Sequence, residues 1–305
     1  MAWWQLSVQS TAAELEQTED SLLELGAVAI TLSDAKDEPL YEPLPGDTPV
    51  WQHSIVTGLF TQQHSLEMLY DGLIQRLPEH QIHTAKKSVV DDQDWSRTHL
   101  KYFKPIQCAE KLWVVPSWHQ PPDPSAINIQ LDPGLAFGTG GHATTALCLG
   151  WLGENDIKGL SVIDYGCGSG ILAIAAYKLG ASELHSIDID PQALEATREN
   201  AKRNDIDPAL LNITLPEQLN PEPVDLLVAN ILSGPLVGFA SKFAGLVKAD
   251  CRILLSGILE TQVDDIKQAY QPYFELDPII VKEDWIRVSG TRKSDRIRQD
   301  TRKNV

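Results

Sequence analysis

The 305-residue sequence contains no long uninterrupted apolar stretch. Because a membrane-spanning helix needs about 20 predominantly apolar residues, no membrane association is expected. The segment Met1–Gln5 also lacks the basic and apolar regions of a signal peptide, which predicts a cytoplasmic protein. The cysteines number only four, are widely scattered and form no CxxC pair. Neither a disulfide framework nor a bound metal is therefore expected from Cys108, Cys148, Cys167 and Cys251.

Basic residues are outnumbered: 25 lysines and arginines stand against 42 aspartates and glutamates, which gives a formal net charge of −17. Such a surface repels phosphate backbones and attracts cations. Direct nucleic-acid binding is therefore not expected, and a basic protein partner is favoured. With 43% hydrophobic residues the chain can bury a sizeable core. Its length predicts one domain of about 180–200 residues beside a smaller one.

Residues 1–90 contain two similar strand–helix–strand segments. The expected strands are Trp4–Val8, Ala27–Leu32, Val50–Phe60 and Ile82–Val90, and the expected helices are Ala12–Leu25 and Ser65–Leu77. The resulting β-α-β-β-α-β order is that of a small ferredoxin-like α+β domain. Residues 91–104 are predicted to form a helical connector, and residues 294–305 a disordered polar tail.

Residues 105–293 are dominated by alternating strands and helices. The expected strands are Leu112–Val115, Ile127–Leu131, Leu160–Asp164, Glu183–Asp188, Asn212–Leu215, Asp225–Asn230, Arg252–Ser256, Ile279–Glu283 and Trp285–Ser289; the expected helices are Ala143–Leu152, Ser169–Leu179, Pro191–Asn204, Pro235–Val247 and Glu260–Tyr270. Such alternation predicts an α/β fold, a parallel sheet with helices on both faces. The last two strands are too close for a crossover helix, so they are expected to form a C-terminal antiparallel hairpin.

A glycine-rich turn follows the expected strand Leu160–Asp164, in the segment Val162–Gly170. Such a turn lets a ligand approach bare backbone at the carboxyl edge of a sheet, so Gly166 and Gly168 are candidate binding residues. Asp188 ends the next strand, 22 residues after Gly166. Its carboxylate is placed to accept hydrogen bonds from the hydroxyls of an adenosine ribose. Asp190 is assigned instead to capping the following helix.

The turn also distinguishes between two kinds of cofactor. A dinucleotide needs its pyrophosphate held at a helix N-terminus. S-Adenosylmethionine has no phosphate and presents an amino-acid end, which a D-x-G-x-G-x-G turn accommodates. The spacing from Asp164 to Gly170 matches the second pattern, so S-adenosylmethionine is the expected cofactor.

Polar residues at two other strand or loop ends complete the candidate site. Asn230 ends the expected strand Asp225–Asn230, where its amide oxygen could hold a substrate N–H and orient the nitrogen, or could cap the helix near Pro235. Thr145 could bind the amino-acid end of the cofactor through its hydroxyl, or could cap the helix Ala143–Leu152. His142 could accept a proton or serve only as a hydrogen-bonding group.

These blocks together resemble the PrmA family, the methyltransferases of large-subunit ribosomal protein eleven. The resemblance covers residues 1–293 and rests on residues 131–145, 162–176, 187–204 and 228–236. It implies a class I methyltransferase (Rossmann-like) domain and cofactor contacts at Thr145, Gly166, Asp188 and Asn230. It also implies an N-terminal recognition domain that presents lysine amines and the terminal amine of the substrate to one site. One departure is Gly141, where the family pattern has a bulkier polar residue.

Three other functions remain open on the residues alone. An Asn at a strand end would also suit methylation of the exocyclic amine of a nucleobase, although the acidic charge counts against it. A nicotinamide oxidoreductase would use a similar turn. A non-catalytic module that only binds S-adenosylmethionine is the third possibility. The enzyme is expected to act as a monomer.

Overall fold

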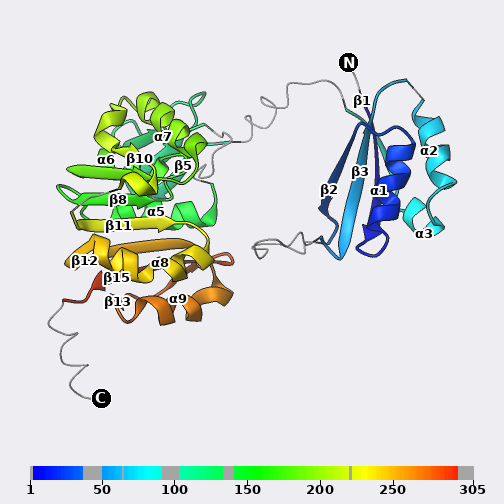
Figure 1. Ribbon diagram of the computed structural model, residues 1–305. Coiled ribbons are helices and arrows are strands. Elements are labelled where there is room, and N and C mark those ends of the chain that lie inside the picture. The colour runs from blue at the N-terminus through cyan, green and yellow to red at the C-terminus, as the bar shows by residue number, and fades with distance from the viewer. Residues whose placement is uncertain are drawn as a thin grey trace, which may run out of the picture. The chain divides into compact units, whose positions relative to one another are not determined.

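The computed structural model describes residues 3–36, 50–63, 65–90, 103–132, 141–219 and 222–294. Its contacts divide the chain into two compact units, residues 1–99 and 100–305 (Figure 1). The predicted connector at 91–104 lies outside the described residues except for its last two positions, and the predicted tail lies outside them except for Ser294. In the part of the chain that is described, no helix is long and apolar enough to cross a bilayer.

The first unit is a four-stranded antiparallel sheet with helices packed on one face. Its elements are β1 (Trp3–Thr11), α1 (Leu15–Glu24), β2 (Ala29–Asp34), β3 (His53–Phe60), α2 (Leu66–Ile74), α3 (Glu79–Ile82) and β4 (Lys86–Val90), with strand order β2-β3-β1-β4. The helices α1 and α2 lie on the same face of the sheet (Figure 1), and their apolar residues form one core with alternate residues of β1 and β3. This order fits the ferredoxin-like unit expected from the sequence.

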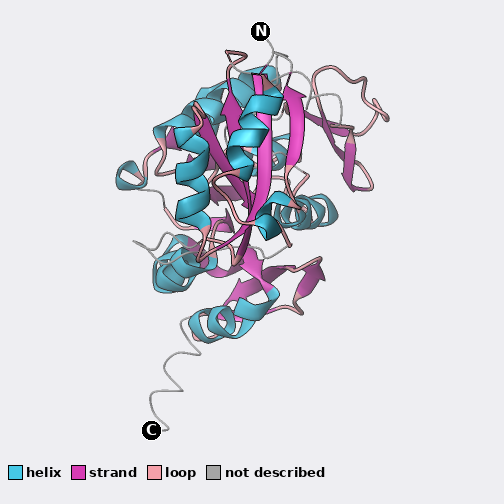
Figure 2. Cartoon of the chain, turned by 90° about the vertical axis from the view of Figure 1, so that its right-hand side faces the viewer, coloured by secondary structure: helices cyan, strands magenta, loops and turns pink. Residues whose placement is uncertain are grey.

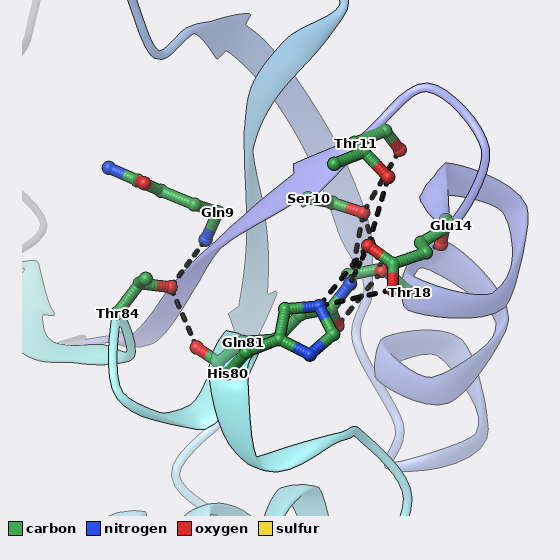
Figure 3. A network of polar contacts seen from close by, with 8 residues as sticks. All are labelled: Gln9, Ser10, Thr11, Glu14, Thr18, His80, Gln81 and Thr84. Carbon is green, nitrogen blue, oxygen red and sulfur yellow. Dashed lines mark hydrogen bonds and ion pairs between the residues drawn. The ribbon is translucent and has the colours of Figure 1, made fainter.

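The predicted strand Ile82–Val90 is wrong in its first part, because residues 79–82 form the short helix α3. The reason is a polar network between β1, α1 and α3 (Figure 3). The buried amide of Gln81 donates to the hydroxyl of Ser10 at 3.2 Å and accepts from Thr18 at 3.3 Å. His80 lies 3.1 Å from the carboxylate of Glu14. A helical turn after Pro78 points both side chains at α1, which an extended strand would not do.

The second unit is built on a large mixed sheet. Its strands are β8 (Ser161–Tyr165), β9 (Glu183–Ile187), β10 (Ile213–Thr214), β11 (Val224–Asn230), β12 (Val247–Leu259), β13 (Phe274–Leu276), β14 (Ile280–Lys282) and β15 (Trp285–Arg292). The order is β10-β9-β8-β11-β12-β15-β13, and β14 pairs only with β15 (Figure 1). The first five strands are parallel, whereas β13 and β14 run antiparallel to β15, which confirms the predicted hairpin.

Helices cover both faces of this sheet, as the sequence predicts (Figure 2). They are α5 (Ala143–Glu154), α6 (Ile171–Lys178), α7 (Pro191–Arg203), α8 (Ser233–Leu246) and α9 (Val263–Tyr270). Strand β11 shows the division: Leu226 and Val228 pack with α5 and α6, whereas Leu227 and Ala229 pack with α8 and α9. Successive residues of a strand point to opposite faces, so an uninterrupted apolar run marks a strand buried on both sides.

Several boundaries differ from the sequence predictions. A separate sheet joins β5 (Ile106–Ala109), β6 (Leu112–Val115) and β7 (Ile127–Gln130), of which β5 was not expected. The three-residue strand β13 was also missed, since such a short element has no measurable periodicity. Strand β12 extends to Leu259 rather than Ser256, and α8 begins two residues before Pro235.

The amino edge of the parallel sheet carries an ion pair between Asp225 and Lys248. Asp225 accepts hydrogen bonds from the N–H and the hydroxyl of Ser161 at 2.9 and 2.7 Å, and from Lys248 at 2.8 Å. Partial burial raises the pKa of the Asp225 carboxyl, but these hydrogen bonds outweigh it and lower the pKa to about 2. A carboxyl whose pKa is lowered by folding stabilises the protein above its unfolded pKa.

We therefore expect Asp225→Asn to lower the free energy of unfolding by about 2 kcal/mol at pH 7. The deficit should shrink as the pH falls from about 4 to about 2, because the wild-type carboxyl then takes up the proton that removes its advantage. Urea unfolding of both proteins across this range checks the prediction. If the variant is less stable than wild type by the same amount at the high and low ends of this pH range, the ion pair is not the cause of the difference.

Candidate active site

The glycine-rich turn between β8 and α6 lies at the carboxyl edge of the sheet. Gly166, Gly168 and Gly170 have φ angles of 82°, 54° and 78°, a region that side-chain-bearing residues seldom adopt. The N–H groups of Gly166 and Cys167 both donate to the carbonyl of Ile187 at the end of β9, at 2.7 and 2.9 Å. The turn is thereby fixed against the neighbouring strand.

The structure brings the predicted residues Gly168 and Asp188 together. One carboxylate oxygen of Asp188 accepts the N–H of Gly168 at 2.9 Å, and the other accepts the N–H of Asp190 at 3.0 Å. Each carboxylate oxygen can accept a further hydrogen bond. Asp190 caps α7 by accepting the N–H of Gln192 at 2.8 Å, which confirms its assignment as a capping residue.

Asp164, at the start of the turn motif, is a site candidate that the sequence reasoning did not single out. Its side chain is buried, and one oxygen accepts the N–H of Ala173 at 3.0 Å. The other oxygen accepts no hydrogen bond from the described residues. Burial raises the pKa of this carboxyl to about 7, against the lowering effect of the Ala173 bond, and the charge of Asp188 adds to the rise. A buried acceptor without a partner is costly, and such groups concentrate at functional sites.

The structure also joins Asn230 and Thr145, which are 85 positions apart in the chain. The amide Nδ2 of Asn230 donates to the hydroxyl of Thr145 at 3.3 Å. The amide Oδ1 is buried and has no hydrogen-bond partner among the described residues. The α8 helix begins at Ser233 with Leu232 as its N-cap, so Asn230 does not cap it. Thr145 is likewise not a cap, because it lies inside α5 and is fully buried.

His142 is the N-cap of α5. Its Nδ1 accepts the N–H of Thr144 at 3.4 Å and lies 2.8 Å from the Thr144 hydroxyl. The imidazole also packs edge-on against Trp285 at the start of β15, with ring centroids 5.0 Å apart. A structural role therefore accounts for His142. The preceding glycine-rich segment, residues 133–140, lies outside the described residues.

One further feature of this edge was not predicted. The side chain of Ile189, which follows Asp188, is 80% exposed and offers an apolar surface beside the Asp188 carboxylate. Within the described ranges, no group of three or more histidine, cysteine or acidic side chains is arranged to hold a metal ion. All four cysteines lie in these ranges and are free.

Comparison with known proteins identifies the family. The family model described as ribosomal protein L11 methyltransferase (PrmA) matches residues 2–293. The ribosomal protein L11 methyltransferase of Ectopseudomonas mendocina is 47% identical over 300 residues, 96% of this chain and all of the relative. That of Azotobacter vinelandii is 48% identical over 297 residues, again 96% of this chain and 100% of the relative.

A solved structure agrees with the sequence relatives. The ribosomal protein L11 methylase of Lactobacillus delbrueckii subsp. bulgaricus is 35% identical, with a TM-score of 0.56. The match covers 63% of this chain and 100% of that one. With a parallel sheet that places a glycine turn, Asp188 and Asn230 at one edge, the chain belongs to the PrmA family of ribosomal protein L11 methyltransferases.

Proposed function

We propose that this chain transfers methyl groups from S-adenosylmethionine to lysine side-chain amines and to the N-terminal amine of ribosomal protein L11. The observation that carries the proposal is the buried Oδ1 of Asn230, an acceptor without a partner among the described residues. An amine N–H is the donor that such an oxygen lacks. The Thr145 hydroxyl holds the other end of the amide, so the direction of Oδ1 is set before substrate arrives.

The residues at the carboxyl edge fit the cofactor. Gly166 and Gly168 hold the turn at positive φ, a conformation in which backbone can approach the cofactor's amino-acid end closely. Asp188, fixed by two backbone N–H groups, accepts the ribose hydroxyls through its remaining lone pairs. The unpartnered oxygen of Asp164 accepts from the cofactor's amine. The exposed side chain of Ile189 provides an apolar surface for the adenine.

When bound, the cofactor supplies a methyl group on a positively charged sulfur. The attacking amine must be neutral, and removing the proton from a lysine at pH 7.4 costs about 4 kcal/mol. The proton leaves to water before attack, and desolvation beside a positive charge favours the neutral amine. The Oδ1 of Asn230 then accepts a hydrogen bond from one N–H of the amine, which would turn the nitrogen lone pair toward the methyl carbon. Gly166, Gly168 and Asp188 would hold the cofactor that supplies the methyl group to this nitrogen.

The charge distribution suits a basic substrate. Residues 1–99 contain 16 acidic and 5 basic residues, a net charge of −11 out of −17 for the whole chain. The first unit therefore carries most of the attraction for a lysine-rich protein. It forms the substrate-recognition domain, and the second unit forms the methyltransferase domain. The enzyme acts as a monomer in the cytoplasm and does not bind nucleic acid directly.

Asn230→Ala tests this assignment. We expect the turnover number to fall by about 100-fold, because the amine is no longer oriented, while cofactor affinity changes much less. Methyl transfer to purified ribosomal protein L11 and calorimetry with S-adenosylmethionine measure the two effects. Asn155→Ala is a matched control, since it also removes one amide hydrogen bond but at the other end of α5. Unchanged turnover at saturation would refute the orienting role.

A further inference from the structure

Ile231, the residue after Asn230, lies between Gly166 and Gly257, and neither glycine position has room for a side chain. A Cβ atom at Gly166, in the glycine-rich turn between β8 and α6, would lie 2.1 Å from Cγ2 of Ile231. A Cβ atom at Gly257, in β12, would lie 2.2 Å from the carbonyl oxygen of Ile231 and 2.7 Å from its carbonyl carbon. The side chain of Ile231 therefore contacts the glycine-rich turn, and its backbone contacts β12.

Gly257 occupies an irregularity in β12 that depends on glycine. Its φ angle is 83°, and the pairing of β12 with β15 shifts register between Leu255 and Ile258. The preceding residue, Ser256, pairs with Asn230 in the parallel ladder and donates its hydroxyl to the carbonyl of Ile286 at 2.9 Å. The Ser256 hydroxyl thus supplies a hydrogen-bond donor to the Ile286 carbonyl at the point where the register shifts. Bulges of this kind redirect the chain beside functional sites.

We propose that Gly257 is a positioning residue of the methyl-transfer centre, acting through Ile231 on Asn230. The inference rests on the role proposed above for Asn230. Because the Ile231 carbonyl packs directly on the Gly257 backbone, the chain leaving β11 has one available path. That path sets the direction in which the Asn230 side chain points. Any side chain at position 257 would displace the Ile231 backbone, and a shift of about 1 Å near reacting atoms costs about 100-fold in rate.

Gly257→Ala and Gly159→Ala form the test pair. Gly159 also has a positive φ, 79°, but a Cβ atom there would meet nothing within 4 Å. Both variants introduce the same backbone strain, so both should melt at a lower temperature than wild type. Only Gly257→Ala should lose turnover with ribosomal protein L11, by about 10-fold or more, with KM and the S-adenosylmethionine Kd close to wild type. A folded Gly257→Ala protein with wild-type kcat, or an equal loss in Gly159→Ala, overturns the proposal.

A double variant separates positioning from a general structural effect. If Gly257 acts through Asn230, the protein with both Asn230→Ala and Gly257→Ala should turn over no more slowly than Asn230→Ala alone. Losses that multiply contradict the proposal. If Gly257→Ala does not fold, Ser256→Ala replaces it, because it removes the hydrogen bond to Ile286 that fixes the same irregularity. The same loss of kcat and the same non-additivity are expected, and wild-type kcat in that variant would contradict the proposal. A normal kcat in Asn230→Ala, by contrast, would refute the proposed role of Asn230 itself.

Discussion

Asp164→Asn is expected to stabilise the cofactor-free protein at pH 8 by up to about 4 kcal/mol. Burial raises the pKa of the Asp164 carboxyl to about 7, so the folded protein keeps this proton when the unfolded chain has released it. The contribution of the group to stability is therefore lost as the pH rises from about 4 to about 7. Asparagine has nearly the same shape, can keep the hydrogen bond from Ala173, and has no proton to lose.

Urea unfolding at pH 4 and pH 8 measures this difference. The variant and wild type should be alike at pH 4 and diverge at pH 8, the opposite pH dependence to that of Asp225→Asn. S-Adenosylmethionine should bind the variant more weakly, by about 1–3 kcal/mol, because an amide NH2 group would then face the cofactor's amine. Equal stability of variant and wild type at pH 8 would mean that Asp164 is not strained by its burial.

A fragment that starts at Lys104 is expected to bind S-adenosylmethionine but to methylate intact ribosomal protein L11 about 10²- to 10⁴-fold more slowly than the full chain. Every proposed cofactor contact lies in the second unit, which has its own core. The first unit has a separate core and carries most of the negative charge. Its removal should therefore leave the sheet folded and eliminate the tethering that concentrates the target amines.

A short lysine-containing peptide provides the control substrate. It is too small to use a remote recognition surface, so the fragment and the full chain should methylate it at similar rates. A fragment that methylates the intact substrate normally would show that the first unit does not recognise it. A fragment that aggregates or fails to bind cofactor would show that the first unit is needed for folding of the second.

Residues close together in sequence were the easiest to interpret correctly. The turn from Gly166 to Gly170 and the cap at Asp190 depend on local backbone chemistry, which glycine spacing and a following proline indicate directly. The order of strands and helices in the second unit could be predicted for the same reason, since each long element has its own periodicity. Asp188 and Asn230 were predicted from their positions at strand ends, and the family resemblance implied cofactor contacts for both.

Contacts between distant segments could not be obtained in that way. Nothing near Thr145 in the sequence indicates that it receives the amide of Asn230, and nothing near His142 indicates that it packs on Trp285. The helix α3 was read as a strand because its buried polar residue, Gln81, is held by partners on β1 and α1. Gly257 was overlooked because the lack of space for a side chain there comes from the backbone of Ile231, a distant residue that follows β11.

The position of β15 has a consequence for how this protein is made. The strand Trp285–Arg292 lies between β12 and β13, both of which precede it in the chain. During synthesis, β12 therefore emerges with an open edge and β13 with no neighbour at all until the later strand exists. An open strand edge can pair with another chain and so promote aggregation. The growing polypeptide is thus most vulnerable just before its sheet closes, and a break in translation upstream of residue 285 would release a product that exposes that edge.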